Sequence, residues 1–205
     1  MKMAVELSNK LDWLNADPQM VSAHRGRVVA LLFWNASSVY CHNALADMFQ
    51  LQRKHPENLS VLAIHVPKFA AELEQKTLLD AINRLDIQLP VANDTQWTTW
   101  QHYGIQCWPS VVLIDPQGGI AGEFSGDDCR KDIESRLSAL LAEMPYATSP
   151  KPKNLKAKPK PKVFSALHSP CGLLIHNNLL YIADTGHNRI LECGFDGRVK
   201  RVFGN

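Results

Sequence analysis

The sequence lacks any long hydrophobic run. Its longest uninterrupted apolar stretch is residues 28–34 (VVALLFW), far short of the roughly 20 residues that a membrane-spanning helix needs. The first ten residues, MKMAVELSNK, reach charged side chains before an apolar region typical of a secretion signal develops. We therefore expect a cytoplasmic protein that does not associate with membranes.

Paired cysteines are also lacking. The five cysteines are odd in number and include no Cys-x-x-Cys pair, so they fit neither a complete disulfide framework nor a four-ligand zinc site. Gly-rich phosphate loops and the His-Glu-x-x-His and Gly-x-Ser-x-Gly motifs are absent as well. We expect no metal and no cofactor, and unpaired cysteines are typical of a reducing compartment.

Charge divides the chain into two regions. Residues 1–146 carry 12 Lys and Arg against 17 Asp and Glu, whereas residues 147–205 carry 10 against 3. The stretch 148–162 holds six lysines, four prolines and one leucine, too little apolar area to fold. We predict one domain over 1–146, an extended linker over 147–162 and a small unit after it, over 163–205. Because the basic linker has no aromatic side chain to stack on bases, we expect no nucleic-acid partner.

Apolar periodicity alternates between strand and helix along the first region. Strands are predicted at residues 28–34, 60–66, 111–114 and 120–124, and a short one after Pro90. Helices are predicted at residues 44–52, 69–85, 95–103 and 128–144. Strands that alternate with helices and end in an antiparallel hairpin, here around the turn DPQGG, indicate an α/β sandwich with a central mixed sheet.

Two separated motifs carry a family resemblance. A strand ending in Phe33-Trp34 precedes Ser38-Val39-Tyr40-Cys41, and Tyr103-Gly104-Ile105 leads into Cys107-Trp108-Pro109. This order resembles the thioredoxin fold. It resembles more narrowly the thioredoxin-like domain that precedes NHL repeats in a family of two-part proteins, where the Trp13-Leu14-Asn15 segment also occurs. The resemblance covers nearly all of residues 10–145 and implies a three-layer α/β sandwich.

The resemblance implies a redox site that is degraded here. The family's Cys-x-x-Cys lies at the start of the first long helix, where amide groups and the helix dipole lower the pKa of the first, attacking cysteine. Ser38 occupies that position, so ordinary dithiol exchange is not expected and only Cys41 remains. Leu32 stands where thioredoxins often hold a buried, proton-shuttling carboxylate.

The same resemblance predicts a binding groove. In the family a cis-proline at the position of Pro109 shapes a groove for extended partner chain, so the Trp108-Pro109 bond is expected to be cis. The predicted binding residues are Trp34, Tyr40, Cys107, Trp108 and Pro109.

Cys41 itself has several interpretations. It is the candidate catalytic residue of a single-thiol oxidoreductase or, through a weak likeness of Ser38-x-x-Cys41 to the Thr-x-x-Cys of peroxiredoxins, of a peroxidase. The alternative is a small, inert, packed side chain. A bridge from Cys41 to Cys107 also stays open, because spacing alone does not establish its geometry.

The tail carries a second resemblance. The segment 179–190 (LLYIADTGHNRI), followed by Phe195-Asp196-Gly197, resembles one NHL repeat, which implies a four-stranded antiparallel blade of a β-propeller. In this blade Asp184 and Arg189 are expected to pair across a turn. The repeat occurs once, so its apolar faces are expected to be exposed and open to self-association.

Three functions fit these patterns. They are a single-thiol redox enzyme using Cys41, a binding module for proteins or extended peptides, and the N-terminal part of a longer thioredoxin-NHL scaffold. We expect a thioredoxin-like NHL repeat protein with weak or absent dithiol activity that acts as a binding module, because a working exchange enzyme needs a thiol at Ser38.

Overall fold

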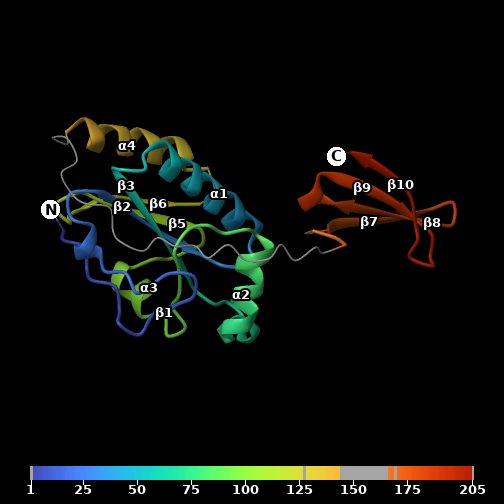
Figure 1. The fold of residues 1–205 in the computed structure, drawn as a ribbon, viewed down its shortest axis with the longest axis horizontal. Coiled ribbons are helices and arrows are strands. Elements are labelled where there is room, and N and C mark those ends of the chain that lie inside the picture. Colours follow the sequence, from blue (N-terminus) through green and yellow to red (C-terminus); the bar gives the residue numbers. More distant parts are fainter. Residues whose placement is uncertain (1, 127, 144–165, 169, 205) are drawn as a thin grey trace. The chain divides into compact units, whose positions relative to one another are not determined.

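The computed structural model describes residues 2–126, 128–143, 166–168 and 170–204, which form two compact units (Figure 1). Among the described residues the first unit ends at residue 143 and the second begins at residue 166. The predicted linker over 147–162 lies outside the described residues. No helix in the described part of the chain has the length and apolar character needed to cross a membrane.

A mixed sheet of six strands forms the centre of the first unit, in the order β1-β4-β3-β2-β5-β6. The strands are β1 (Asp12–Trp13), β2 (Val28–Trp34), β3 (Leu59–His65), β4 (Val91–Asn93), β5 (Ser110–Ile114) and β6 (Ile120–Ser125). β2 pairs in parallel with β3 and antiparallel with β5. Every residue of β2, β3 and β5 is buried, which is the burial that continuous apolar strands predict for the middle of a covered sheet.

Helices cover both faces of this sheet (Figure 1). They are α1 (Val39–Lys54), α2 (Gln75–Arg84), α3 (Thr98–Tyr103) and α4 (Arg130–Ala142), with 3₁₀ turns η1 (Val21–His24) and η2 (Ala70–Leu73). Side chains of β2 alternate between two hydrophobic clusters. Leu32 packs in the cluster with α1, α2 and α4, and Phe33 packs in the cluster with α3 and η1. The unit is therefore a three-layer α/β sandwich.

The helix predicted over residues 69–85 is interrupted in the structure. Residues 70–73 form the 3₁₀ turn η2, Glu74 is extended (φ −74°, ψ 125°), and only then does α2 begin. The cause lies in Glu72, whose carboxylate turns inward and accepts hydrogen bonds from the backbone N–H groups of Lys68 and Phe69. Apolar periodicity does not report such a polar anchor, so the sequence predicted one continuous helix.

The helix predicted to start at residue 95 begins three residues later. Asp94 accepts hydrogen bonds from the N–H groups of Thr98 (3.0 Å) and Trp100 (2.9 Å), and so satisfies free donors in the first turn of α3. Trp97 precedes the helix in the left-handed region (φ 58°). Trp97 and Trp100 nevertheless pack together, with ring centroids 5.4 Å apart.

The Trp13-Leu14-Asn15 segment extends the edge of the sheet. β1 pairs antiparallel with β4, and Leu14 donates its N–H to the carbonyl of Val91 at 3.0 Å. Beyond β1 the side chain of Asn15 replaces the backbone ladder, since its amide donates to the Leu89 carbonyl (2.8 Å) and accepts from the Val91 N–H (2.7 Å). A buried asparagine thus fixes β4 next to the edge strand β1.

The second unit is a four-stranded antiparallel sheet in the order β10-β9-β8-β7. Its strands are β7 (Pro170–His176), β8 (Leu179–Asp184), β9 (Arg189–Cys193) and β10 (Val199–Gly204), with a 3₁₀ turn η3 (Thr185–His187) after β8. Asn177 and Asn178 join β7 to β8 with positive φ angles of 48° and 58°, as a two-residue hairpin turn of type I′ requires.

The strand register separates the two faces of this sheet. One face, here called the aliphatic face, carries a cross-strand row with a member on each strand, made of Leu173, Ile182, Leu191 and Val202. The opposite face carries the polar row that contains Tyr181, Glu192 and Arg201. No helix of the second unit covers the aliphatic face within residues 170–204, and Leu173 is 72% exposed.

Candidate functional site

Residues 35–38 form the loop between β2 and α1, and Ser38 is the N-cap residue of α1. Cys41 lies in the first turn of this helix and is wholly buried. Val39 and Tyr40, between Ser38 and Cys41, are 59% and 56% exposed. The predicted Ser-x-x-Cys motif therefore presents its two middle residues to solvent and turns its thiol inward.

The Cys41 sulfur has two hydrogen-bond partners in the loop. The backbone N–H of Asn35 donates to Sγ at 3.3 Å, and the Ser38 side chain also hydrogen-bonds the thiol. Burial nevertheless raises the pKa of Cys41; these two hydrogen bonds oppose the rise, and the nearby Cys107 thiol adds to it. Cys41 and Cys107 are both free thiols in this structure. The site therefore favours the protonated, less nucleophilic form of Cys41.

Two neighbouring positions on β2 are core residues. Leu32 is wholly buried in the hydrophobic cluster with α1 and α4, so the first unit has no carboxylate at that position. Trp34 was predicted to bind a partner, but its side chain has no exposed surface in this structure. β2 is covered on both faces, and the Trp34 ring is wholly buried, edge-on to His65 at 5.0 Å. Trp34 is therefore a core residue that packs beside the polar residue His65.

The Trp108-Pro109 peptide bond is cis and lies just before β5. Pro109 is buried, whereas Trp108 is half-buried and Cys107 is exposed. The Trp108 ring packs on those of Trp100 and Trp97, with centroids 4.7 and 5.5 Å away. Of these predicted binding residues, Cys107 and Trp108 are therefore open to a partner, while Pro109 shapes the backbone beneath them.

Sequence reasoning missed Glu72, the most connected side chain of the site. Glu72 as a whole residue is only 4% exposed. It accepts hydrogen bonds from the Asn35 amide (2.8 Å), the Ser37 hydroxyl, and the backbone N–H groups of Lys68 (2.7 Å) and Phe69 (3.2 Å). Burial by itself would raise the pKa of Glu72, but these donors outweigh burial and lower it. The one available signal was the position of Glu72 three residues after Phe69, a helix-capping distance.

Two further polar residues join Glu72 at the carboxyl ends of the parallel strands. His65 ends β3 and shares a hydrogen bond between its Nδ1 and Asn93 Oδ1 at 2.9 Å, and the Asn93 amide donates to the Glu72 carbonyl at 3.5 Å. Burial lowers the pKa of His65, against opposing effects of Asn93 and Glu72. A connected polar network thus lies beneath the loop that carries Ser38.

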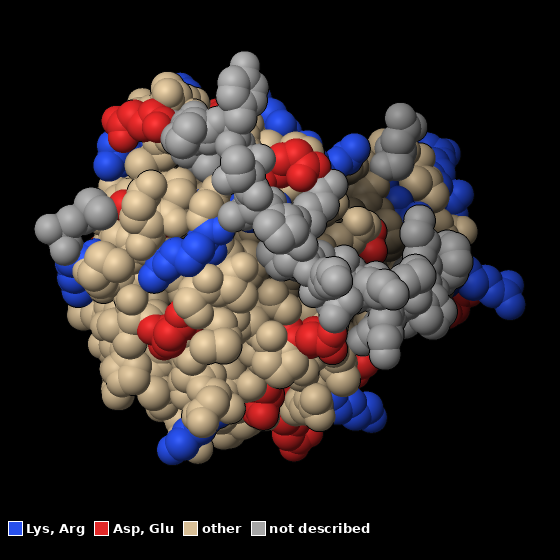
Figure 2. All heavy atoms as spheres, turned by 60° about the vertical axis from the view of Figure 1, so that its left-hand side comes forward, with Lys and Arg blue, Asp and Glu red and all other residues tan. Residues whose placement is uncertain are grey.

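The described residues contain no cluster of three or more His, Cys, Asp or Glu side chains arranged to hold a metal ion. The face shown in Figure 2 has a broad expanse of uncharged side chains, over which acidic and basic residues are scattered.

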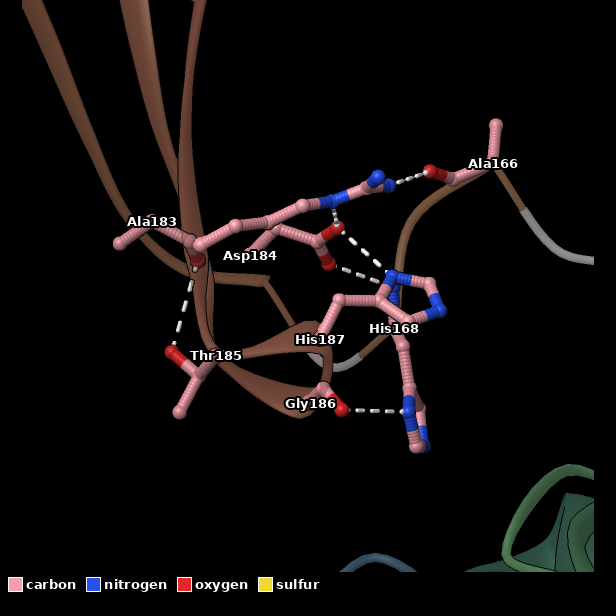
Figure 3. A network of polar contacts seen from close by, with 8 residues as sticks. Ala166, His168, Ala183, Asp184, Thr185, Gly186 and His187 are labelled. Carbon is pink, nitrogen blue, oxygen red and sulfur yellow. Dashed lines mark hydrogen bonds and ion pairs between the residues drawn. The ribbon is translucent and has the colours of Figure 1, made fainter. Parts of the chain in front are cut away.

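In the second unit one buried carboxylate organises a loop and a turn (Figure 3). Asp184 accepts hydrogen bonds from the N–H of His168 (2.6 Å), Nδ1 of His187 (2.8 Å) and Nε of Arg189 (2.8 Å). Burial by itself would raise the pKa of Asp184, but these donors lower it to about 2. The predicted pairing of Asp184 with Arg189 is confirmed, and its role is structural.

Known proteins resemble this chain in two ways. Residues 26–120 match a family model described as Thioredoxin-like. Over 89% of its length the chain is 32% identical to Protein SUPPRESSOR OF QUENCHING 1, chloroplastic, of Arabidopsis thaliana, and over 97% it is 28% identical to NHL repeat-containing protein 2 of Gallus gallus. The chain spans 18% and 28% of the length of these two proteins.

A solved structure supports the fold of the first unit. A thiol-disulfide isomerase from Corynebacterium glutamicum matches with a TM-score of 0.62 and 23% identity, over 68% of this chain and 97% of that one. The first unit therefore contains a domain that matches the thioredoxin-like family model, within a chain that is similar to NHL repeat-containing proteins over nearly its whole length.

Proposed function

We propose that the first unit is a protein-binding module that has lost conventional dithiol exchange. One observation carries this proposal: Ser38 stands at the position of the attacking thiol, and the remaining Cys41 is wholly buried with a raised pKa. A serine hydroxyl forms no mixed disulfide, and a protonated, buried thiol is a poor nucleophile. Disulfide exchange would need a thiol in place of the Ser38 hydroxyl and an accessible, more readily ionised thiol at Cys41.

The exposed residues around the degraded motif form the proposed binding surface. Val39 and Tyr40 lie at the start of α1, and Cys107 and Trp108 precede the cis-proline. Aromatic side chains such as Tyr40 and Trp108 provide large contact areas with few rotatable bonds, and such residues dominate many protein interfaces. An extended, uncharged peptide segment of a partner protein is the ligand that this surface suits.

The alternative is a single-thiol oxidoreductase or peroxidase that uses Cys41. It is favoured by the two hydrogen bonds that the Cys41 sulfur receives from Asn35 and Ser38, because donors of this kind stabilise a thiolate. Relatives with thiol-disulfide exchange in their names also favour it. The burial of Cys41 argues against it, since peroxide or a disulfide would have to reach a thiol without exposed surface.

An insulin reduction assay with dithiothreitol separates the binding module from the single-thiol oxidoreductase. The unmodified protein should not accelerate insulin precipitation, whereas Ser38→Cys should recover part of the activity because a thiol would then lie at the N-terminus of α1. Adding Cys41→Ser to Ser38→Cys should abolish the recovered turnover. Robust turnover by the unmodified protein, lost in Cys41→Ser alone, would replace the binding module by the single-thiol enzyme.

For the second unit we propose a single blade of the β-propeller type, with a capacity for self-association through its aliphatic face. The four antiparallel strands, the likeness to NHL repeat-containing proteins and the uncovered aliphatic row with Leu173 and Ile182 support this proposal. The free cysteines suit a reducing, cytoplasmic location. Sedimentation at rising concentration tests self-association, which Leu173→Ser should weaken.

A further inference from the structure

We propose that Glu72 is the positioning residue of the Cys41 site, because it holds the 35–38 loop closed over the thiol. Glu72 lies on η2, outside the motif, and its side chain joins that turn to the loop. This role deepens the proposed function, in which Cys41 is a buried and unreactive thiol. It rests on that proposal in one respect, because it explains why Cys41 stays sheltered from solvent.

The connection from Glu72 to Cys41 runs through Asn35. The Asn35 amide donates to Glu72 at 2.8 Å and to the Val66 carbonyl at 3.0 Å, and its oxygen accepts the Ser37 N–H at 3.0 Å. The backbone N–H of the same asparagine donates to the Cys41 sulfur at 3.3 Å. Asn35 thus contacts the carboxylate with its side chain and the thiol with its backbone.

A second connection runs through the serines. The Ser37 hydroxyl donates to the other carboxylate oxygen of Glu72. Ser38 follows directly; its N–H donates to the Asn35 carbonyl at 3.3 Å, and its own carbonyl accepts the Cys41 N–H at 3.1 Å. The loop is therefore tied at Asn35 and Ser37 to Glu72, and at Asn35 and Ser38 to Cys41.

Electrostatics makes this closure specific to a carboxylate. A charged residue that is 4% exposed is stable only when hydrogen bonds replace its lost water, and two of the four donors to Glu72 come from the loop. Opening the loop would leave a buried carboxylate with half of its donors. The closed loop, which shelters Cys41, is therefore stabilised by Glu72 in particular.

Alkylation of the intact chain by iodoacetamide tests the inference. The Cys41 thiolate displaces iodide and forms a thioether, and mass spectrometry of the Cys41 peptide gives the rate between pH 6 and 10. In Glu72→Ala, Cys41 should react about ten-fold faster at pH 8 than in the unmodified protein, and the midpoint of its pH profile should move down by about one unit toward an ordinary thiol. Glu72→Gln keeps the shape of the side chain. Its Cys41 rate and pH midpoint should therefore lie between those of Glu72→Ala and those of the unmodified protein.

Two controls separate positioning from general destabilisation. Cys107 is exposed in the same molecule, so its rate should stay the same in each variant. Val61→Ala removes buried volume from β3 but no hydrogen bond of the loop, and should lower stability while leaving the pH midpoint of Cys41 in place.

The inference would be overturned by an unchanged Cys41 rate and midpoint in Glu72→Ala. A shift of equal size in Val61→Ala would overturn it as well. If Glu72→Ala fails to fold, the comparison of Glu72→Gln with the unmodified protein decides in the same way. None of these readouts involves a partner or insulin turnover, so the inference and the proposed function can fail separately.

Discussion

The Asp184 carboxylate and the Arg189 guanidinium pair across the turn between β8 and β9, with 2.8 Å between Oδ2 and Nε. The Asp184 side chain is wholly buried, whereas 29% of the Arg189 side chain is exposed. Arg189 also donates to the Ala166 carbonyl at 2.9 Å, and Asp184 accepts the His168 N–H. The pair therefore fixes both the turn and the segment that precedes β7.

Asp184→Asn should loosen this turn. The replacement amide brings N–H donors toward Arg189 and His168, which are donors themselves, and so leaves buried groups unsatisfied. We expect amide exchange in peptides from residues 179–193 to become about ten-fold faster. This corresponds to a fall of ~1.4 kcal/mol in the free energy of local opening. Because all five tryptophans lie in the first unit, the thermal transition followed by tryptophan fluorescence should not change.

Asp196→Asn is the matched control for that experiment. Asp196 also pairs with an arginine, Arg198, but at 3.6 Å and with 61% of the aspartate side chain exposed. Exposed pairs of this kind contribute little, so exchange in peptides 179–193 should be unaffected. Equal acceleration in the two variants would show that the buried pair has no special role.

Much of the first unit could be predicted from local pattern. The run 28–34 is β2 residue for residue, because a continuous apolar stretch of strand length suits a sheet covered on both faces. The DPQGG turn also lies between two strands: Asp115 accepts the N–H groups of Gln117 and Gly119, and Gly118 has a φ of 90° that favours glycine. In both places neighbouring residues alone determine the conformation.

The polar part of the site could not be predicted in this way. Asn93 is 28 residues from His65 and 21 from Glu72, and Glu72 is 37 residues from Asn35. These residues meet because β3 and β4 pair in parallel and η2 folds back on the 35–38 loop. Nothing in the apolar periodicity of residues 69–85 distinguishes an inward Glu72 from a solvent-facing one. The resemblance placed Trp34 among the binding residues, although the apolar run 28–34 by itself predicts a strand covered on both faces, because a resemblance indicates which residues surround a site without indicating which of them face solvent.

Asn15→Ala should destabilise the first unit. The change removes two buried hydrogen bonds, to the Leu89 carbonyl and from the Val91 N–H, and leaves both backbone groups unpaired. The free energy of unfolding, measured by urea titration with tryptophan fluorescence, should fall by about 2 to 3 kcal/mol. Asn43→Ala removes an exposed asparagine from α1 and should change the free energy of unfolding by less than about 0.5 kcal/mol. A similar small loss in Asn15→Ala would show that water replaces its partners.

Stability of the first unit should fall as the pH drops from 6.5 toward 4. Burial, aided by Arg27 and opposed by Glu6, lowers the pKa of His24 to about 4, so the folded state keeps this ring neutral where the unfolded chain binds a proton. The unfolded state then holds more protons, and stability decreases as pH decreases through this window. Between pH 7 and 5 the loss from His24 should be roughly 2 kcal/mol, measured by urea titration.

His24→Leu should reduce this pH dependence. The ring is 1% exposed, and neither of its nitrogens has a hydrogen-bond partner among the described residues, so an apolar side chain loses no bond there. Part of the dependence should remain, because burial also lowers the pKa of His65. His102→Gln changes an exposed histidine on α3 and should leave the profile as it is. A full pH dependence in His24→Leu would contradict the assignment.

The second unit should be far less protected than the first against hydrogen exchange in a dilute monomer. β7 is exposed along its whole length, and the aliphatic face has no covering layer within residues 170–204, whereas β2 is buried throughout. An isolated four-stranded sheet of this size is close to the lower limit of independent stability. Amides of β7 and β10 should therefore exchange at least roughly a hundred-fold faster than those of β2.

Leu191→Ala, at a position that is 4% exposed, should accelerate exchange in β8 and β9 further, and Leu173→Ala on the same face, at a position that is 72% exposed, should not. Protection equal to that of β2 in dilute solution would contradict this account and require a covering surface from the chain itself. Protection that rises with protein concentration and disappears in Leu173→Ser would instead identify a second copy as the covering layer.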